Sequence, residues 1–169
     1  MTMQPDFPQL KIELDIVPEG QNRQDRALSK DAGHTIFTYL KEQSKNQNYT
    51  IEPVYTGTLG AGNEFLVLWQ FVHDNQELVI AAFGGVIALL KMIHTKIRSN
   101  KNLSCTGTTV EVLDKKIAAQ GAASIDEVIV KLEEECRRQI EVKKSDGTRV
   151  SRIAETKIII EVAKRSDNA

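Results

Sequence analysis

The chain has 169 residues, with 22 basic and 23 acidic side chains and a formal net charge of −1. A chain of this length suits one domain, which buries about 70% of its unfolded surface without a disulfide or metal staple. The balanced charge excludes the broad positive surface that is typical of proteins binding nucleic acid or anionic membranes.

The two cysteines, Cys105 and Cys136, are too few for a disulfide framework or a zinc site, so we expect two reduced thiols. The segment from Met1 to Pro8 is short and polar and lacks the apolar stretch of a signal peptide. We therefore expect a cytoplasmic protein. It would have a flexible arm over residues 1–9 and a single domain over residues 10–165.

The first elements are a strand and a helix. From Leu10 to Val17, Ile12, Leu14 and Ile16 alternate with charged residues, which predicts a half-buried strand. A helix is then expected from about Asp25 to Ser44, because apolar residues recur there at three-to-four spacing. These residues are Leu28, Ala32, Ile36, Phe37 and Leu40.

A second strand is predicted from Tyr49 to Tyr55. Pro53 indicates that this strand lies at the edge of a sheet or ends early, because proline has no N–H to donate to a neighbouring strand. The glycine-rich segment Gly57–Gly62 follows as a connector. It precedes a predicted helix, where such turns can bind phosphate, but it matches neither the P-loop nor the dinucleotide-binding motif.

Residues 63–99 are the most apolar part of the chain, and we predict two helices there. They run from Asn63 to His73 and from about Gln76 to Arg98, with a break at the turn-favouring pair Asp74-Asn75. The stretch Leu78–Leu90 has three interpretations: a membrane span, a helix buried in the protein's own core, or an apolar helix covered by a partner. It is shorter than the about 20 residues that a span requires, which favours the two protein-packed alternatives.

The pair Gly84-Gly85 lies within this apolar stretch. Each glycine costs about 1 kcal/mol relative to alanine inside a helix. The pair therefore indicates close approach of another backbone, either from the same subunit or from a partner.

The C-terminal part begins with a hairpin of Thr108–Leu113 and Lys116–Ala119. Ser124 and Glu127 fit a capping box at the start of a helix, and Lys157–Ala163 is strongly β-prone. The order of elements predicts an α+β fold. We expect a small, mostly antiparallel sheet of about four to five strands, with helices on one face that include a central apolar pair.

No catalytic, cofactor or metal site is predicted. The histidines His34, His73 and His94 lie on separate elements, and no His, Cys, Asp or Glu group has the spacing of metal ligands. Cys136 lies on an apolar helix stripe beside acidic residues, which suits a packed core residue better than a reactive thiolate. The basic cluster Lys91–Lys101 contains no interleaved aromatic residues, so we expect no nucleic-acid partner.

Several segments together resemble a known family. They are FTYLK at 37–41, TLGA at 58–61, FGGVIALL at 83–90, the hairpin Thr109–Ala119 and the helix start Ile125-Asp126-Glu127. Their order over residues 10–127 resembles the effector-associated constant component domains of bacterial conflict systems. The resemblance implies an adaptor, without catalytic residues, that links sensors or effectors such as proteases, caspase-like enzymes and nucleotide-dependent switches. Residues 124–165 would form a C-terminal elaboration of that domain.

We therefore predict a non-enzymatic interaction or adaptor module that self-associates or recruits an effector or sensor in bacterial defence or signalling. Aromatic residues concentrate binding energy at interfaces, and Trp69 is the single tryptophan. The candidate interaction residues are Phe65, Leu68, Trp69, Val72, Phe83, Gly84, Gly85 and Ile87. One alternative is a membrane-surface protein that uses the apolar helix 78–98. The other is a small-ligand sensor or enzyme that uses the Gly57–Gly62 turn.

Overall fold

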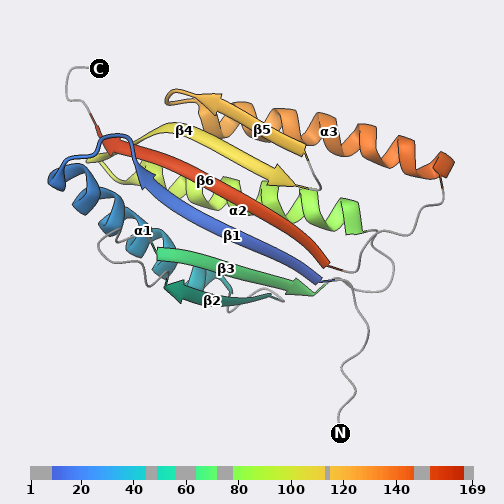
Figure 1. Cartoon of the computed structure of the whole chain (residues 1–169), viewed down its shortest axis with the longest axis horizontal. Helices are drawn as coiled ribbons and strands as arrows, with labels where there is room; N and C mark the ends of the chain where they lie inside the picture. Colours follow the sequence, from blue (N-terminus) through green and yellow to red (C-terminus); the bar gives the residue numbers. More distant parts are fainter. Residues whose placement is uncertain are drawn as a thin grey trace, which may run out of the picture.

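Figure 1 presents a computed structural model of the chain, which describes residues 9–44, 49–55, 64–71, 78–112, 115–146 and 153–165. The elements in chain order are β1 (Gln9–Pro18), α1 (Arg23–Ser44), β2 (Tyr49–Tyr55), β3 (Glu64–Phe71), α2 (Leu78–Ser99), β4 (Leu103–Val112), β5 (Lys115–Gln120), α3 (Ser124–Asp146) and β6 (Ile153–Lys164).

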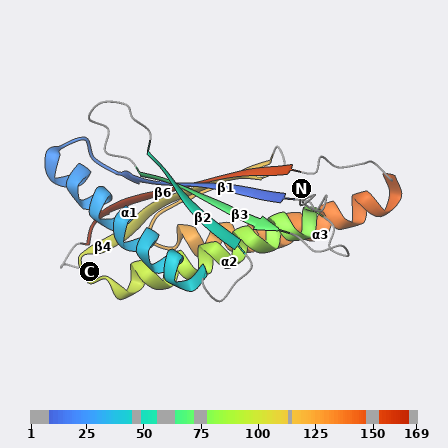
Figure 2. The same cartoon turned by 90° about the horizontal axis from the view of Figure 1, so that it is seen from below.

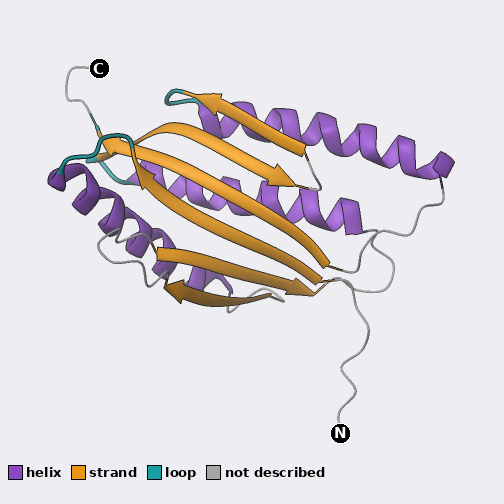
Figure 3. Ribbon diagram, viewed as in Figure 1, coloured by secondary structure: helices purple, strands orange, loops and turns teal. Residues whose placement is uncertain are grey.

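The described strands form one six-stranded sheet in the order β2-β3-β1-β6-β4-β5 (Figure 3). Strands β1 and β6, the first and last described along the chain, pair in parallel at its centre. The other four pairings, β2–β3, β1–β3, β4–β6 and β4–β5, are antiparallel. The sheet is therefore mixed, and its middle depends on contact between residues more than a hundred positions apart.

All three helices lie on one side of the sheet (Figure 2). The alternation along β1 directs Ile12, Leu14 and Ile16 toward them, and all three are buried. A Cβ on Gly33 of α1 would lie 3.8 Å from the Ile16 Cβ, so α1 packs closely on this strand. Burying an aliphatic side chain of this size contributes about 1.5–3 kcal/mol, so the helix-covered face supplies the main stabilisation.

The structure confirms the α+β class and the placement of helices over one face. It also confirms that β2, which contains Pro53, is an edge strand. The predicted hairpin is present as β4–β5. The sheet has six strands rather than four to five.

The prediction of a helix over Asn63–His73 was wrong, because Glu64–Phe71 forms strand β3. The central apolar helix pair is therefore absent, and α2 alone covers that part of the sheet. Strand β3 is paired on both sides, by β1 and β2. An apolar run without alternation suits a fully paired strand as well as a buried helix, and its short length and aromatic residues favour the strand.

The C-terminal strand β6 is central and is paired with β1 and β4. Residues 153–164 are therefore integral to the sheet, although the resemblance implied that residues 124–165 form a C-terminal elaboration. Segments 1–8 and 56–63 lie outside the described residues, and so do most of the predicted flexible arm and the whole Gly57–Gly62 turn.

Helix α2 is amphipathic rather than buried on all sides. Among its described side chains, one side is in the core, made of Phe83, Val86, Leu89, Leu90, Ile93 and Ile97. The opposite side, hereafter the outer stripe, is exposed and consists of Gly84, Ala88, Lys91, Thr95, Arg98 and Ser99. Over residues 83–99, α2 therefore fills the protein's own core with one side and presents small and basic residues on the other.

The exposed position of Gly84 predicts the effect of a simple substitution. A Cβ at this position would meet nothing within 4 Å. Gly84→Ala should therefore raise the free energy of unfolding by about 0.5–1 kcal/mol, the helix-propensity difference. Denaturant titration of dilute protein measures this change.

The matched control is Gly121→Ala, the same change at a residue whose φ is +101°. There the methyl group strains the backbone, so the variant should lose about 1 kcal/mol. Destabilisation by Gly84→Ala would contradict the open environment of Gly84 in the monomer.

Candidate interaction surface

The sheet face opposite the helices, hereafter the open face, carries alternate residues of the strands (Figure 2). No helix of the described structure covers it. Its described side chains are Glu13, Asp15 and Val17 of β1, Ser104, Thr106, Thr109 and Glu111 of β4, Lys116, Ala118 and Gln120 of β5, and Lys157, Ile159, Glu161 and Ala163 of β6.

Acidic side chains outnumber basic ones on the described part of the open face. Four carboxylates stand against two ammonium groups, which gives a formal charge of 2 − 4 = −2. The acidic residues are Glu13, Asp15, Glu111 and Glu161, and the basic ones are Lys116 and Lys157. The whole chain has a charge of only −1. The open face is therefore more acidic than the average surface of the molecule.

The charges follow the register of the strands. Glu13 lies beside Lys157, Lys157 beside Glu111, and Glu111 beside Lys116, so one row across four strands alternates in sign. Opposite charges on neighbouring strands stabilise a sheet by about 0.2–1 kcal/mol per pair. This row favours the same register that the buried apolar residues of the covered face set.

Asp15 is the exceptional residue of the open face, because it is only 9% exposed although no helix covers it. Its Oδ1 atom is buried and has no hydrogen-bond partner. Along the row it lies between Phe65 of β3 and Ile159 of β6. Burial raises the pKa of Asp15, and the positive charge of Lys157 opposes part of that rise. A carboxylate in such a place carries a desolvation cost that a nearby positive charge would offset.

Strand β4 contains a β-bulge where it pairs with β6. The register shifts between Cys105 and Gly107, which leaves Thr106 as the extra residue. The Thr106 hydroxyl donates a 2.8 Å hydrogen bond to Glu161 Oε1. The bulge thus orients one acidic group of the open face.

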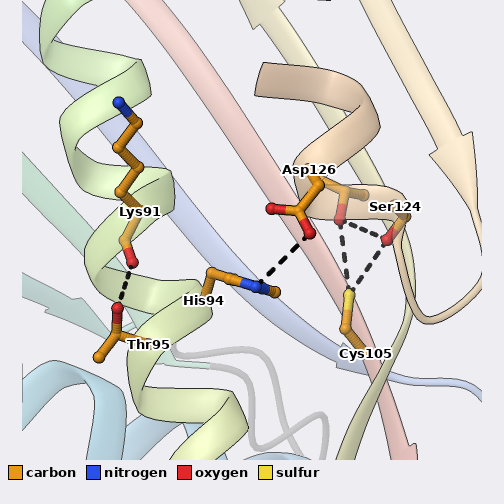
Figure 4. Close-up of polar contacts among 7 residues, drawn as sticks. Lys91, His94, Thr95, Cys105, Ser124 and Asp126 are labelled. Atoms are coloured by element: carbon orange, nitrogen blue, oxygen red, sulfur yellow. Dashed lines mark hydrogen bonds and ion pairs between the residues drawn. The ribbon is translucent and has the colours of Figure 1, made fainter. Parts of the chain in front are cut away.

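A buried polar cluster lies on the helix-covered side (Figure 4). The hydroxyls of Thr108 and Ser124 are 2.8 Å apart, and the Cys105 Sγ lies 3.2 Å from Ser124 Oγ and 3.5 Å from Thr108 Oγ1. The thiol also lies 3.5 Å from the Gly107 carbonyl oxygen, to which it donates. All three side chains are buried, so they satisfy one another and tie the start of α3 to β4.

The predicted capping box at Ser124 was wrong. The N–H of Glu127 donates to the carbonyl of Ala123, so Ala123 occupies the cap position. The Ser124 hydroxyl instead faces the sheet and bonds Thr108 and Cys105. Local sequence suggested that this hydroxyl caps the helix, but tertiary packing directs it toward the sheet.

His94 of α2 lies 3.6 Å from Asp126 of α3, measured from Nε2 to Oδ2 (Figure 4). Asp126 is in the first turn of α3, where the helix dipole favours a negative charge. The contact joins two neighbouring helices at their outer rim, and Asp126 is largely exposed. Sequence reasoning missed it, because the two residues are far apart and neither belongs to a motif.

Both cysteines are free thiols. Cys136 packs against the core, as predicted, and burial raises the pKa of its thiol. A raised pKa leaves less of the nucleophilic thiolate at neutral pH. Within the described residues, no group of three His, Cys, Asp or Glu side chains could hold a metal ion.

The predicted interaction residues do not form one patch. Phe83 is buried in the core, Gly84 is exposed on the outer stripe, and Gly85 and Ile87 are half-buried. On β3, Phe65 and Trp69 lie opposite Asp15 and Lys11, whereas Leu68 lies opposite Ile12. Because opposite residues share a sheet face, positions 65 and 69 belong to the open face and position 68 to the covered one. Val72 lies outside the described residues.

Comparison with known proteins gives no relative for this arrangement: no family model, no curated protein and no solved structure matches the chain. Within the part of the chain that the structure describes, none of the helices has the length and apolar character needed to cross a membrane.

The buried polar cluster predicts a position-specific loss of stability. Thr108→Val keeps the shape of the side chain but leaves the Ser124 hydroxyl and the Cys105 thiol short of a partner. The variant should lose about 1–3 kcal/mol of unfolding free energy, measured by urea denaturation.

Thr109→Val is the control, because the neighbouring Thr109 is half-exposed on the open face. It should change stability by less than about 0.5 kcal/mol. Equal denaturation midpoints for the two variants would show that the cluster adds no specific stability.

The position of Asp15 predicts a pH-dependent effect. Since its pKa is raised in the folded state, its protonated form favours folding at low pH, and that stability is lost as the pH rises through the folded-state value. Asp15→Asn, which stays neutral, should therefore be more stable than the wild type at pH 7. Its advantage should shrink toward pH 4, near the unfolded pKa of about 3.9.

Urea titrations at both pH values measure the difference between the two proteins, so the titration of other groups cancels. Asp31→Asn, at an exposed position of α1, serves as the control and should show no such trend. An advantage of Asp15→Asn that is equal at pH 4 and pH 7 would contradict the assignment.

Proposed function

We propose that this chain is a non-enzymatic protein-interaction module that binds its partner on the open face of the sheet. The observation that carries the proposal is the buried, incompletely paired Asp15 on a face without helices. The buried side chains of the cluster around Ser124 bond one another inside the subunit. The Thr156 hydroxyl is also buried without a partner, but it is uncharged and lies opposite Ile12 on the helix-covered face. The buried carboxylate carries a desolvation cost in the isolated subunit. Such a group is expected at a binding surface, where a partner can supply a hydrogen bond or a positive charge.

The register of β3 supports the same face. Phe65 and Trp69, two of the predicted interaction residues, occupy open-face positions in the row of Asp15 and in the row of Lys11. Aromatic residues are enriched where interface energy concentrates. The resemblance to effector-associated constant component domains supports an adaptor role in bacterial defence or signalling.

The membrane-surface alternative loses its main support. It requires the apolar side of α2 to face lipid, but Phe83, Val86 and Leu90 are buried within the subunit. The exposed side of the helix carries small and basic residues instead. Such a surface lacks the apolar area that interfacial binding needs.

Site-specific photo-cross-linking in cells tests the proposal. A benzophenone amino acid is placed at Thr109 or Ala118, both on the open face. We expect cross-linked species from these two positions, to be identified by mass spectrometry. The matched control is Val130, a 55% exposed side chain on α3.

Adducts from the open face in clear excess over those from Val130 would support the proposal. Equal yields from both faces, or no adduct at Thr109 and Ala118, would refute it.

A further inference from the structure

The two broad surfaces of the molecule differ in charge. The open face carries four acidic and two basic side chains among its described residues. Helix α2, whose outer stripe lies on the opposite side of the molecule, contains no acidic residue and carries Lys91, Lys96 and Arg98 (Figure 2). The described part of the open face is therefore acidic on balance, and the outer stripe of α2 is basic.

The outer stripe of α2 is accessible and shallow. Lys91 and Arg98 are exposed, and so are the small residues Gly84 and Ala88 on the same stripe. Lys96 differs, because its Nζ lies 5.2 Å above the ring of Tyr39 on α1. The outer stripe thus offers two exposed cations, Lys91 and Arg98. The small residues Gly84 and Ala88 beside them would let a sheet approach closely.

We infer that the open face of one copy binds the outer stripe of α2 on a second copy. The inference rests on the proposed function, in which the open face is a docking surface, and identifies its occupant. The contact covers the sheet with helices on both faces, which is a stable arrangement of layers. Lys91 and Arg98 of the second copy approach the acidic centre around Asp15, where low solvent exposure leaves the attraction weakly screened.

Charge also argues against the symmetric alternative, in which two open faces meet. That contact would bring two surfaces of like charge together, whereas the sheet-to-helix contact joins surfaces of opposite charge. The two surfaces of the proposed contact are different, so the interface is heterologous. Because they lie on opposite sides of the molecule, copies would add head to tail rather than close as a two-fold dimer.

Light scattering and sedimentation velocity of the purified full chain test the inference. At about 50 mM salt the average mass should rise with concentration beyond that of a dimer. At about 500 mM salt it should fall back toward the monomer, because screening weakens attraction between exposed charges.

Two double variants block one surface each. Lys91→Glu with Arg98→Glu changes the outer stripe, and Glu111→Lys with Ala118→Arg changes the open face; all four positions are exposed. Each variant should weaken self-association at least about tenfold. An equimolar mixture should form 1:1 dimers and nothing larger, because each partner retains one working surface.

Charge changes on α3 serve as matched controls. Glu134→Lys and Arg137→Glu alter exposed residues away from both surfaces and should assemble like the wild type. Unfolding curves of all variants confirm that they remain folded before association is compared.

Three results would overturn the inference. They are a wild type that stays monomeric at millimolar concentration, a helix variant that still dimerises, and a mixture of the two double variants that stays monomeric. A monomeric wild type together with open-face cross-links to a different protein would refute this inference alone. The absence of open-face cross-links would refute the proposed function itself.

Discussion

The parallel pairing of β1 with β6 at the centre of the sheet is the contact on which the rest of the fold depends. It joins Gln9–Pro18 to Ile153–Lys164, so the two central strands come from opposite ends of the described chain. Each central strand then pairs with an antiparallel neighbour, β3 beside β1 and β4 beside β6. The three helices connect these strands and stay on one side, so no helix of the described structure covers the other side of the sheet.

That one-sided arrangement gives the two faces different physical tasks. The covered face supplies stability through close-packed aliphatic residues such as Leu14, Ile158 and Leu90. The open face places opposite charges next to each other on neighbouring strands, such as Lys157 between Glu13 and Glu111. A surface released from core packing can carry charge and recognition without loss of the fold.

The molecule buries polar groups in two contrasting ways. The cluster of Cys105, Thr108 and Ser124 is internally paired, and it holds α3 on β4 at little cost. Asp15 is buried with an oxygen that has no partner, beside Lys157. The cluster has a structural role, because its hydrogen-bonding groups are paired within the subunit. The burial of Asp15 points beyond the isolated subunit, because an added positive charge would lower its energy.

The sequence alone determined the elements in which apolar residues recur with the clear period of a strand or of a helix. The alternation around Ile12, the stripe of α1 and the proline of β2 each act on local backbone, so their consequences are visible in a short window. It could not determine β3, because a continuous apolar run such as 65–69 has no period to separate a strand from a helix. Only the tertiary structure decided that β6 is central, that Ser124 meets Thr108, and that Asp15 lies buried on an open face. These features come from pairings between distant segments, and the energy of such pairings depends on neighbours that no local pattern specifies.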